Sequence, residues 1–158
     1  MKELRNHYLL MKRDGFTASG ELIGATESAL ALLDIGFWPL FKRTPGRKMV
    51  KPGQKALIYL AGRDKDCQRI IASVTIESIA EWSKQLHAEQ YPLMLDDIPN
   101  LVLNFSDIQI FKTPVLIKEH LDKLDLVPKQ NPAKWGMAMV GGMKSLSDND
   151  YRVLSGSI

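Results

Sequence analysis

Basic and aromatic residues gather in one stretch of the chain, and both residue types are suited to binding nucleic acid. No acidic residue lies between Asp34 and Asp64. The aromatic cluster Phe37-Trp38-Pro39-Leu40-Phe41 opens this gap. The cations that follow it within the gap are Lys42, Arg43, Arg47, Lys48, Lys51, Lys55 and Arg63. Because cations attract backbone phosphates and aromatic rings stack on bases, this pairing predicts a nucleic-acid surface.

The basic stretch has a second interpretation that does not involve nucleic acid. The net charge of +3 is modest and does not by itself indicate a nucleic-acid ligand. The cations can form an ordinary solvated face whose charges are balanced by acidic residues from elsewhere in the chain, such as Asp96 and Asp97. Composition leaves both interpretations open.

Residues with catalytic potential are present, but not in a pattern that predicts catalysis. The three histidines, His7, His87 and His120, lack metal-ligand spacing, and one cysteine, Cys67, forms neither a cluster nor an internal disulfide. The sequence contains no P-loop, dinucleotide fingerprint or nucleophile elbow. We therefore expect no enzyme activity, metal or cofactor. An acid–base role for Asp96, Asp97 or Glu119 is the alternative, a nucleotide-processing enzyme.

The composition is that of one globular domain. The chain has 158 residues, of which 45% are hydrophobic and 25% charged. No apolar run reaches the roughly 18 residues that span a bilayer, and the N-terminal residues do not resemble a secretory signal. We expect a soluble cytoplasmic protein with no membrane association.

Hydrophobic periodicity predicts the strands that would carry these residues. Short apolar or alternating runs at 7–12, 55–61, 69–77 and 101–111 are typical of strands, the second and third joined as a hairpin. The alternation in 101–111 changes phase near Ser106-Asp107, which indicates a bulge. The apolar run 136–140 is interpreted as a last strand. Residues 78–99 are interpreted as loop with a helical turn near Trp82.

Capping residues predict the helices. Thr26 precedes an apolar face in 26–35 that Gly36 ends. Thr113-Pro114 is typical of a helix start, with an apolar stripe in 114–124. Ser147 and Asp150 match a capping box before a short C-terminal helix. These elements predict a mixed α+β domain around one curled sheet.

Several motifs occur in an order that resembles a known domain family. Phe37-Trp38-Pro39 is followed by basic residues and then by Val50-Lys51-Pro52-Gly53-Gln54-Lys55-Ala56-Leu57-Ile58-Tyr59. Later come residues 121–127, Asn131-Pro132-Ala133-Lys134-Trp135-Gly136-Met137 and Ser147-Asp148-Asn149-Asp150-Tyr151. This ordered set, which covers most of residues 37–154, resembles the EVE domain, a member of the PUA-like superfamily.

The resemblance implies a fold, a ligand and a site. The implied fold is a PUA-like curled mixed β-barrel with short flanking helices, one domain over 1–158 in which 13–36 is a helical insertion. The implied function is recognition of a modified base in DNA or RNA through an aromatic pocket with a basic rim. The pocket residues would be Trp38, Phe37, Tyr8, Tyr59, Trp135 and Met137. Phosphate contacts, assigned mainly on charge, would be Lys42, Arg43, Arg47 and Lys48.

The sequence also departs from the family pattern. Family members usually open their first strand with an aromatic residue and then tryptophan, where this chain has Tyr8-Leu9. The pocket would then lack a wall or use Tyr8 or Phe16 in its place. Tryptophans in connecting segments can also simply pack in the core. A regulatory domain whose basic loop binds an acidic partner protein remains a third possible function.

Overall fold

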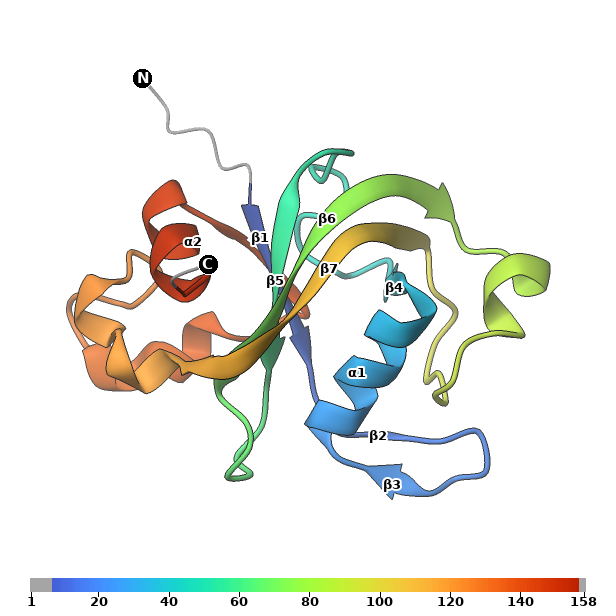
Figure 1. Cartoon of the computed structure of the whole chain (residues 1–158), viewed down its shortest axis with the longest axis horizontal. Coiled ribbons are helices and arrows are strands. Elements are labelled where there is room, and N and C mark those ends of the chain that lie inside the picture. The colour runs from blue at the N-terminus through green and yellow to red at the C-terminus, as the bar shows by residue number, and fades with distance from the viewer. Residues whose placement is uncertain (1–6, 157–158) are drawn as a thin grey trace.

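A six-stranded mixed sheet forms the centre of the molecule (Figure 1). The computed structural model describes residues 7–156, and residues 1–6 and 157–158 lie outside the described part. The strand order is β4-β7-β6-β5-β1-β8, with β1 parallel to β5 and the other neighbours antiparallel. The strands are β1 (His7–Lys12), β4 (Phe37–Leu40), β5 (Lys55–Leu60), β6 (Arg69–Glu81), β7 (Leu101–Leu116) and β8 (Met143–Leu146).

Short elements complete the domain. The strands β2 (Gly15–Phe16) and β3 (Leu22–Ile23) pair as a separate hairpin before the helix α1 (Ala25–Ile35), and α2 (Asp148–Leu154) follows β8. A π-helical turn spans Lys84–Ala88, and 3₁₀ turns span Ile117–Glu119, Leu121–Lys123 and Pro132–Ala138. No helix within residues 7–156 is both long enough and apolar enough to cross a bilayer.

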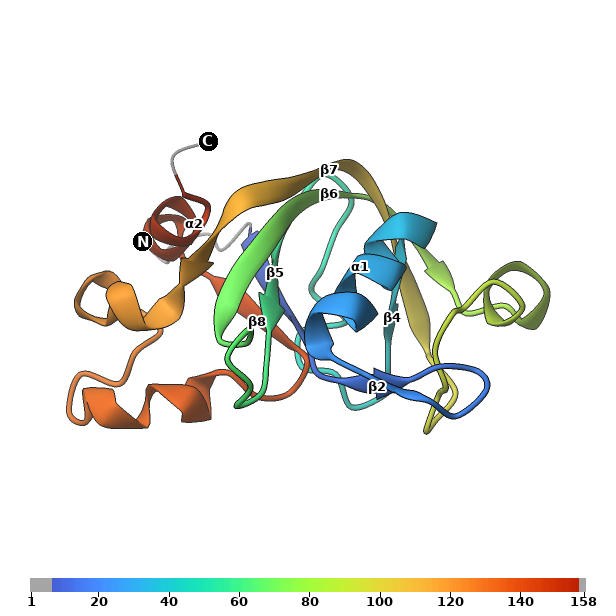
Figure 2. The same cartoon turned by 60° about the horizontal axis from the view of Figure 1, so that its bottom comes forward.

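The sheet curls around α1, and its two faces bury separate hydrophobic clusters. β6 and β7 arch over α1 (Figure 2), whose Ala29 and Leu32 pack with Leu10 and Ile58 of the sheet. Because side chains alternate along a strand, the neighbouring residues face the other way. That second face packs Tyr59 and other residues against Trp135 of the last 3₁₀ turn and Leu154 of α2.

The predicted bulge in 101–111 is confirmed, and it contributes to the curl. The register between β6 and β7 shifts between the pairs Ser73–Gln109 and Thr75–Ser106. Asp107 lies within this shift and has a positive φ of 49°. A bulge adds a residue to one strand and increases its local twist. Three other predictions are also confirmed. They are the hairpin of 55–61 and 69–77, the strand 7–12 and the end of the first helix at Gly36.

The helix predicted over 114–124 is wrong. β7 continues to Leu116, and Thr113 and Pro114 lie inside it. Pro114 is tolerated because it falls in the irregular stretch between the paired residues Ile110 and Val115, where no ladder hydrogen bond is required of it. Of the apolar residues taken for a helical stripe, Ile117 and Leu121 begin two separate 3₁₀ turns, and Leu124 follows the second turn.

Three other predicted elements need correction. Residues 136–140 belong to a 3₁₀ turn and its exit, and the last strand is β8, which pairs with β1. Residues 78–81 extend β6, so the expected loop begins later. The N-cap of α1 is Gly24 rather than Thr26, and no side chain caps it.

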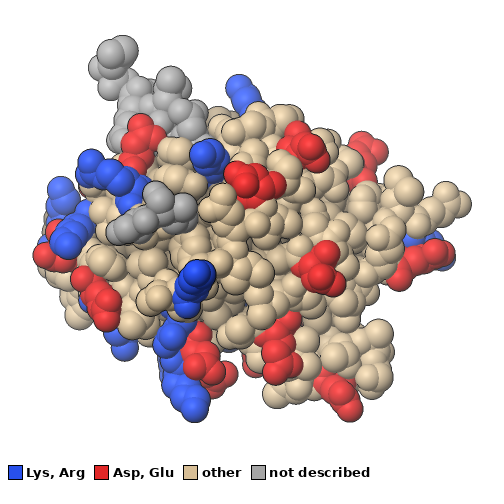
Figure 3. All heavy atoms as spheres, viewed as in Figure 1, with Lys and Arg blue, Asp and Glu red and all other residues tan. Residues whose placement is uncertain are grey.

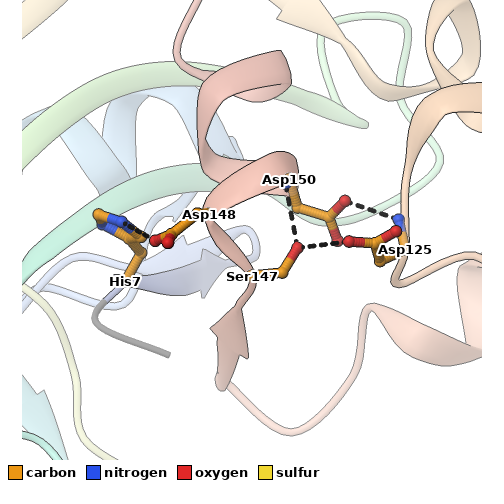
Figure 4. Close-up of polar contacts among 5 residues, drawn as sticks. All are labelled: His7, Asp125, Ser147, Asp148 and Asp150. Atoms are coloured by element: carbon orange, nitrogen blue, oxygen red, sulfur yellow. Dashed lines mark hydrogen bonds and ion pairs between the residues drawn. The ribbon is translucent and has the colours of Figure 1, made fainter. Parts of the chain in front are cut away.

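Part-buried hydrogen bonds attach α2 to the segment after β7 (Figure 4). The N-cap half of the predicted capping box is confirmed, since Ser147 Oγ accepts the Asp150 N–H at 3.1 Å. The Asp150 carboxylate in turn accepts the N–H groups of Asp125 and Leu126. Ser147 Oγ donates to Asp125 Oδ2 at 2.7 Å. These bonds fix the course of the chain on the second face of the sheet.

Candidate nucleic-acid interface

A cleft of about 700 Å³ lies where the ends of β1 and β5 meet the segment that leads into β8. Met11 and Tyr59 line it from the strands, and Trp135 and Met139 line it from the chain around the last 3₁₀ turn. All four side chains are at most 9% exposed, so the walls are fixed by core packing. The other lining residues are Arg13, Ala61, Gly62, Arg63, Gln68, Lys118, Ala133, Gly136, Val140, Gly141 and Gly142.

The charges of the cleft are all positive. Arg13, Arg63 and Lys118 line it, and no Asp or Glu is among the lining residues. All three cations are exposed. Within residues 7–156 the one ion pair is that of His7 with Asp148, so none of the three cations is neutralised by a described carboxylate. Unpaired cations beside aromatic walls provide the two contacts that a nucleotide needs.

Tyr59 remains protonated over the whole physiological pH range. Burial raises the pKa of Tyr59 to about 12, and the nearby Cys67 thiol adds to the shift. The hydroxyl forms no side-chain hydrogen bond within residues 7–156, although the ring lines the cleft. A neutral phenol can both donate and accept a hydrogen bond. Tyr59 therefore offers a bound ligand a polar group as well as part of a ring.

Gln68 brings an amide to the cleft from a strained backbone position. Its φ is +64°, which a non-glycine residue seldom adopts. Two backbone hydrogen bonds hold Gln68 in place. Its N–H donates to the Leu60 carbonyl, and its carbonyl accepts the Ile117 N–H. Such strain persists only where surrounding structure enforces it, and it is common at functional sites. The amide side chain can donate and accept, as the edge of a base does.

A smaller hollow of about 230 Å³ adjoins the cleft and shares Arg13 and Arg63 with it. Asp14, Asp64 and Cys67 also line this hollow, so its charge is mixed. Burial, followed by nearby carboxylates, raises the pKa of the Cys67 thiol. The thiolate is the nucleophilic form of cysteine, so this burial works against a nucleophilic role for Cys67.

Two of the six expected ligand-binding residues, Tyr59 and Trp135, line the cleft. Trp38, Phe37 and Tyr8 are instead core residues, at most 6% exposed, and none lines the cleft. Trp38 lies in β4 rather than in a connecting segment, and its ring packs beside Phe105 inside the curl. These three side chains pack in the core, and the pocket role expected for them stays a prediction. Met137 is 70% exposed and lies outside the cleft lining.

The basic loop, residues 42–48, lies outside the cleft but contacts one of its walls. None of Lys42, Arg43, Arg47 and Lys48 lines the cleft, and none forms an ion pair within the described residues. The balancing role considered for Asp96 and Asp97 is thus not observed. Pro45 lies so close to Gly141 that a Cβ there would be 3.1 Å from the proline ring.

Sequence reasoning missed Arg13, Gln68 and Lys118 as cleft residues. They come from three separate strand ends, and no local motif marks any of them. The alternative catalytic carboxylates Asp96, Asp97 and Glu119 are exposed and outside the cleft lining. No group of three or more potential metal ligands occurs among residues 7–156.

Surface charges are unevenly distributed on the face that Figure 3 shows. In the view of Figure 3, Lys and Arg gather over the half that carries α2, while Asp and Glu dominate the half that carries α1 and the β2–β3 hairpin. The sequence has the same asymmetry, since residues 14–41 and 85–111 contain no Lys or Arg. A polyanion would therefore approach the molecule from its basic half.

Comparisons with known proteins identify the fold. No family model and no curated protein matches the chain. Among solved structures, ASCH from Zymomonas mobilis matches 98% of this chain and 96% of its own, with a TM-score of 0.60 and 11% identity. The N-terminal domain of McrB from Staphylothermus marinus matches 100% of this chain and 99% of its own, with a TM-score of 0.57 and 10% identity. The chain therefore has the PUA-like fold, a curled mixed β-barrel with short flanking helices.

Proposed function

We propose that this chain is a nucleic-acid-binding module that accepts one base of a DNA or RNA strand in the cleft. The observation that carries the proposal is the composition of the cleft, which combines Tyr59 and Trp135 with three unpaired cations and no carboxylate. In the finer form of the proposal, the base is a modified one. The ordered sequence motifs support a distant relationship to the EVE domain.

The contacts have separate tasks in this proposal. Aromatic stacking stabilises a bound base by about 1–3 kcal/mol, which offsets the few kcal/mol that extruding a base from a duplex costs. Gln68 and the Tyr59 hydroxyl would hydrogen-bond the base edge. Arg13, Arg63 and Lys118 would bind the flanking phosphates, which adds affinity that is independent of sequence.

Binding without turnover is proposed because the cleft lacks groups for acid–base catalysis. No Asp, Glu, His or Cys is among its lining residues. Tyr59, its one titratable group besides the cations, has a pKa of about 12 and would not exchange a proton near neutral pH.

The test is fluorescence anisotropy with short labelled oligonucleotides, either unmodified or carrying a methylated or hydroxymethylated base. Arg63→Glu and Lys118→Glu should each weaken binding at least tenfold, because each places a negative charge where a phosphate is expected. Lys48→Glu and Arg43→Glu are the matched controls, since both lie in the basic loop outside the cleft. Preference for one modified base would support the finer proposal.

Salt dependence gives an independent readout. For a single strand, each phosphate neutralised contributes about −0.7 to the slope of log K against log salt concentration. Three cleft cations predict a slope of roughly −2, and each reversal variant should reduce its magnitude. Loss of binding in Lys48→Glu with normal binding in Arg63→Glu would move the interface to the basic loop. No binding to any oligonucleotide would contradict the proposed function.

A further inference from the structure

The β2–β3 hairpin presents a row of exposed apolar side chains on the side of the molecule that is poor in cations. Phe16 and Leu22 are directly paired across the hairpin. An isolated bridge between Thr17 and Leu93 places the segment around Leu93 beside β2, and the Met94 N–H donates to the Phe16 carbonyl at 2.8 Å. Met94 therefore stands beside Phe16, and the row runs Leu22–Phe16–Met94.

The opposite face of this small sheet shows that the row is not a displaced part of the core. Ile23 and Leu93, the neighbours of Leu22 and Met94, turn inward and pack in the cluster around α1. The outward positions would ordinarily be polar in a one-sided sheet. Instead Leu22 is 64%, Met94 55% and Phe16 49% exposed. An apolar row with its own buried reverse face is typical of an interaction site.

Exposed carboxylates lie close to the row in the sequence. Asp14, Glu21, Asp96 and Asp97 flank the hairpin strands and the bridged segment along the chain, and all four are exposed. Asp14 and Asp96 both lie near Lys12, whose ammonium is partly buried and therefore depressed in pKa. Segments 14–41 and 85–111, which supply the row, contain no Lys or Arg. A nucleic acid would be repelled here, whereas a basic protein segment would be attracted.

We propose that this acidic apolar row is a docking site for a basic amphipathic helix of a partner protein. Neighbouring strands lie about 4.8 Å apart, so the three side chains form a line of roughly 10 Å. Helix residues three or four positions apart are about 5–6 Å apart and match this spacing. Apolar anchors on one helix face would contact Leu22, Phe16 and Met94, while lysines and arginines beside them would meet the carboxylates. This site is separate from the cleft and does not depend on the proposed function.

The experiment uses the full chain and a synthetic helical peptide with leucines on one face and lysines on the other. Two-dimensional amide NMR spectra are recorded as the peptide is added. Saturable shifts should concentrate on residues 15–23 and 93–97. Phe16→Ser with Leu22→Ser should weaken the peptide affinity tenfold or more, because buried apolar anchors carry most of the energy of such interfaces. Ile110→Ser is the control, since Ile110 is 58% exposed on β7.

The role of charge is tested by reversing the charge on either the chain or the peptide. Glu21→Lys with Asp96→Lys should reduce affinity for the basic peptide, and Glu77→Lys with Glu119→Lys should leave it unchanged. A peptide with glutamates in place of lysines should not bind. Equal binding of both peptides, or shifts spread over the whole surface, would overturn the proposal. Concentration-dependent self-association of the chain, abolished by the Phe16 and Leu22 substitutions, would overturn it in favour of a second copy as the occupant.

Discussion

Asp150 Oδ1 accepts the backbone N–H of Asp125 at 2.6 Å, although the two residues are 25 positions apart in sequence. Asp150 is 1% exposed, and its other carboxylate oxygen accepts the Leu126 N–H at 2.9 Å. One side chain thus satisfies two backbone groups of the irregular chain that covers the second face of the sheet. The same chain leads on to the segment that forms one wall of the cleft.

Asp150→Ala should lower the free energy of unfolding by about 1–3 kcal/mol, because it leaves the part-buried N–H groups of Asp125 and Leu126 without acceptors. Chemical denaturation monitored by circular dichroism would measure the change. Asp122→Ala is the matched control, since Asp122 is exposed on a neighbouring turn and should have little effect. Equal stability of the two variants would show that the Asp150 hydrogen bonds contribute nothing net.

Trp38→Ala should destabilise the fold rather than remove a ligand contact. Trp38 is 4% exposed and packs beside Phe105 in the inner cluster. Truncation of a buried tryptophan typically costs about 3–5 kcal/mol. Thermal unfolding would detect this loss, with Met137→Ala as the exposed comparison. A Trp38→Ala protein with unchanged stability and no oligonucleotide binding would restore Trp38 as a ligand-binding residue.

Tyr59 should make stability depend on alkaline pH. Burial raises its pKa from 10.0 to about 12, so between these values the unfolded chain has lost the proton that the native state retains. Stability is therefore highest below pH 10 and falls as pH rises through the window. Tyr59→Phe should reduce this fall. An absorbance titration of the Tyr59→Phe variant should also show one fewer phenol ionising near pH 12 than the unsubstituted protein. An unchanged titration would contradict the assignment of this pKa to Tyr59.

Gly141→Ala should disturb the contact between the basic loop and the cleft wall. Gly141 has a φ of +98°, and an added Cβ would lie 3.1 Å from the Pro45 ring. Backbone strain of this kind costs about 1–3 kcal/mol, which a shift in melting temperature would report. Gly136→Ala is the matched control within the same cleft, because a Cβ there would meet no atom within 4 Å. Similar melting temperatures for both variants would rule out the close approach.

Local patterns in the sequence determined the elements whose signals are short-range. Alternation at Ile70, Ala72, Val74 and Ile76 predicted the body of β6, and the capping box at Ser147 predicted α2. A change of phase at Asp107 predicted the bulge. Each of these signals lies within a few residues, and so it can be interpreted without knowing what the segment packs against.

Tertiary structure alone decided where β7 ends and which residues form the cleft. Val115 and Leu116 join β7 because Ile70 and Arg69 of β6 are beside them, and that pairing overrides a plausible helix start at Thr113-Pro114. The sequence by itself determined an aromatic and basic composition suited to nucleic acid. It did not determine that Trp38 lies inside the curl while Arg13, Arg63 and Lys118 meet at one cleft. That outcome depends on which face of each strand the curled sheet turns inward, a property of long-range pairing.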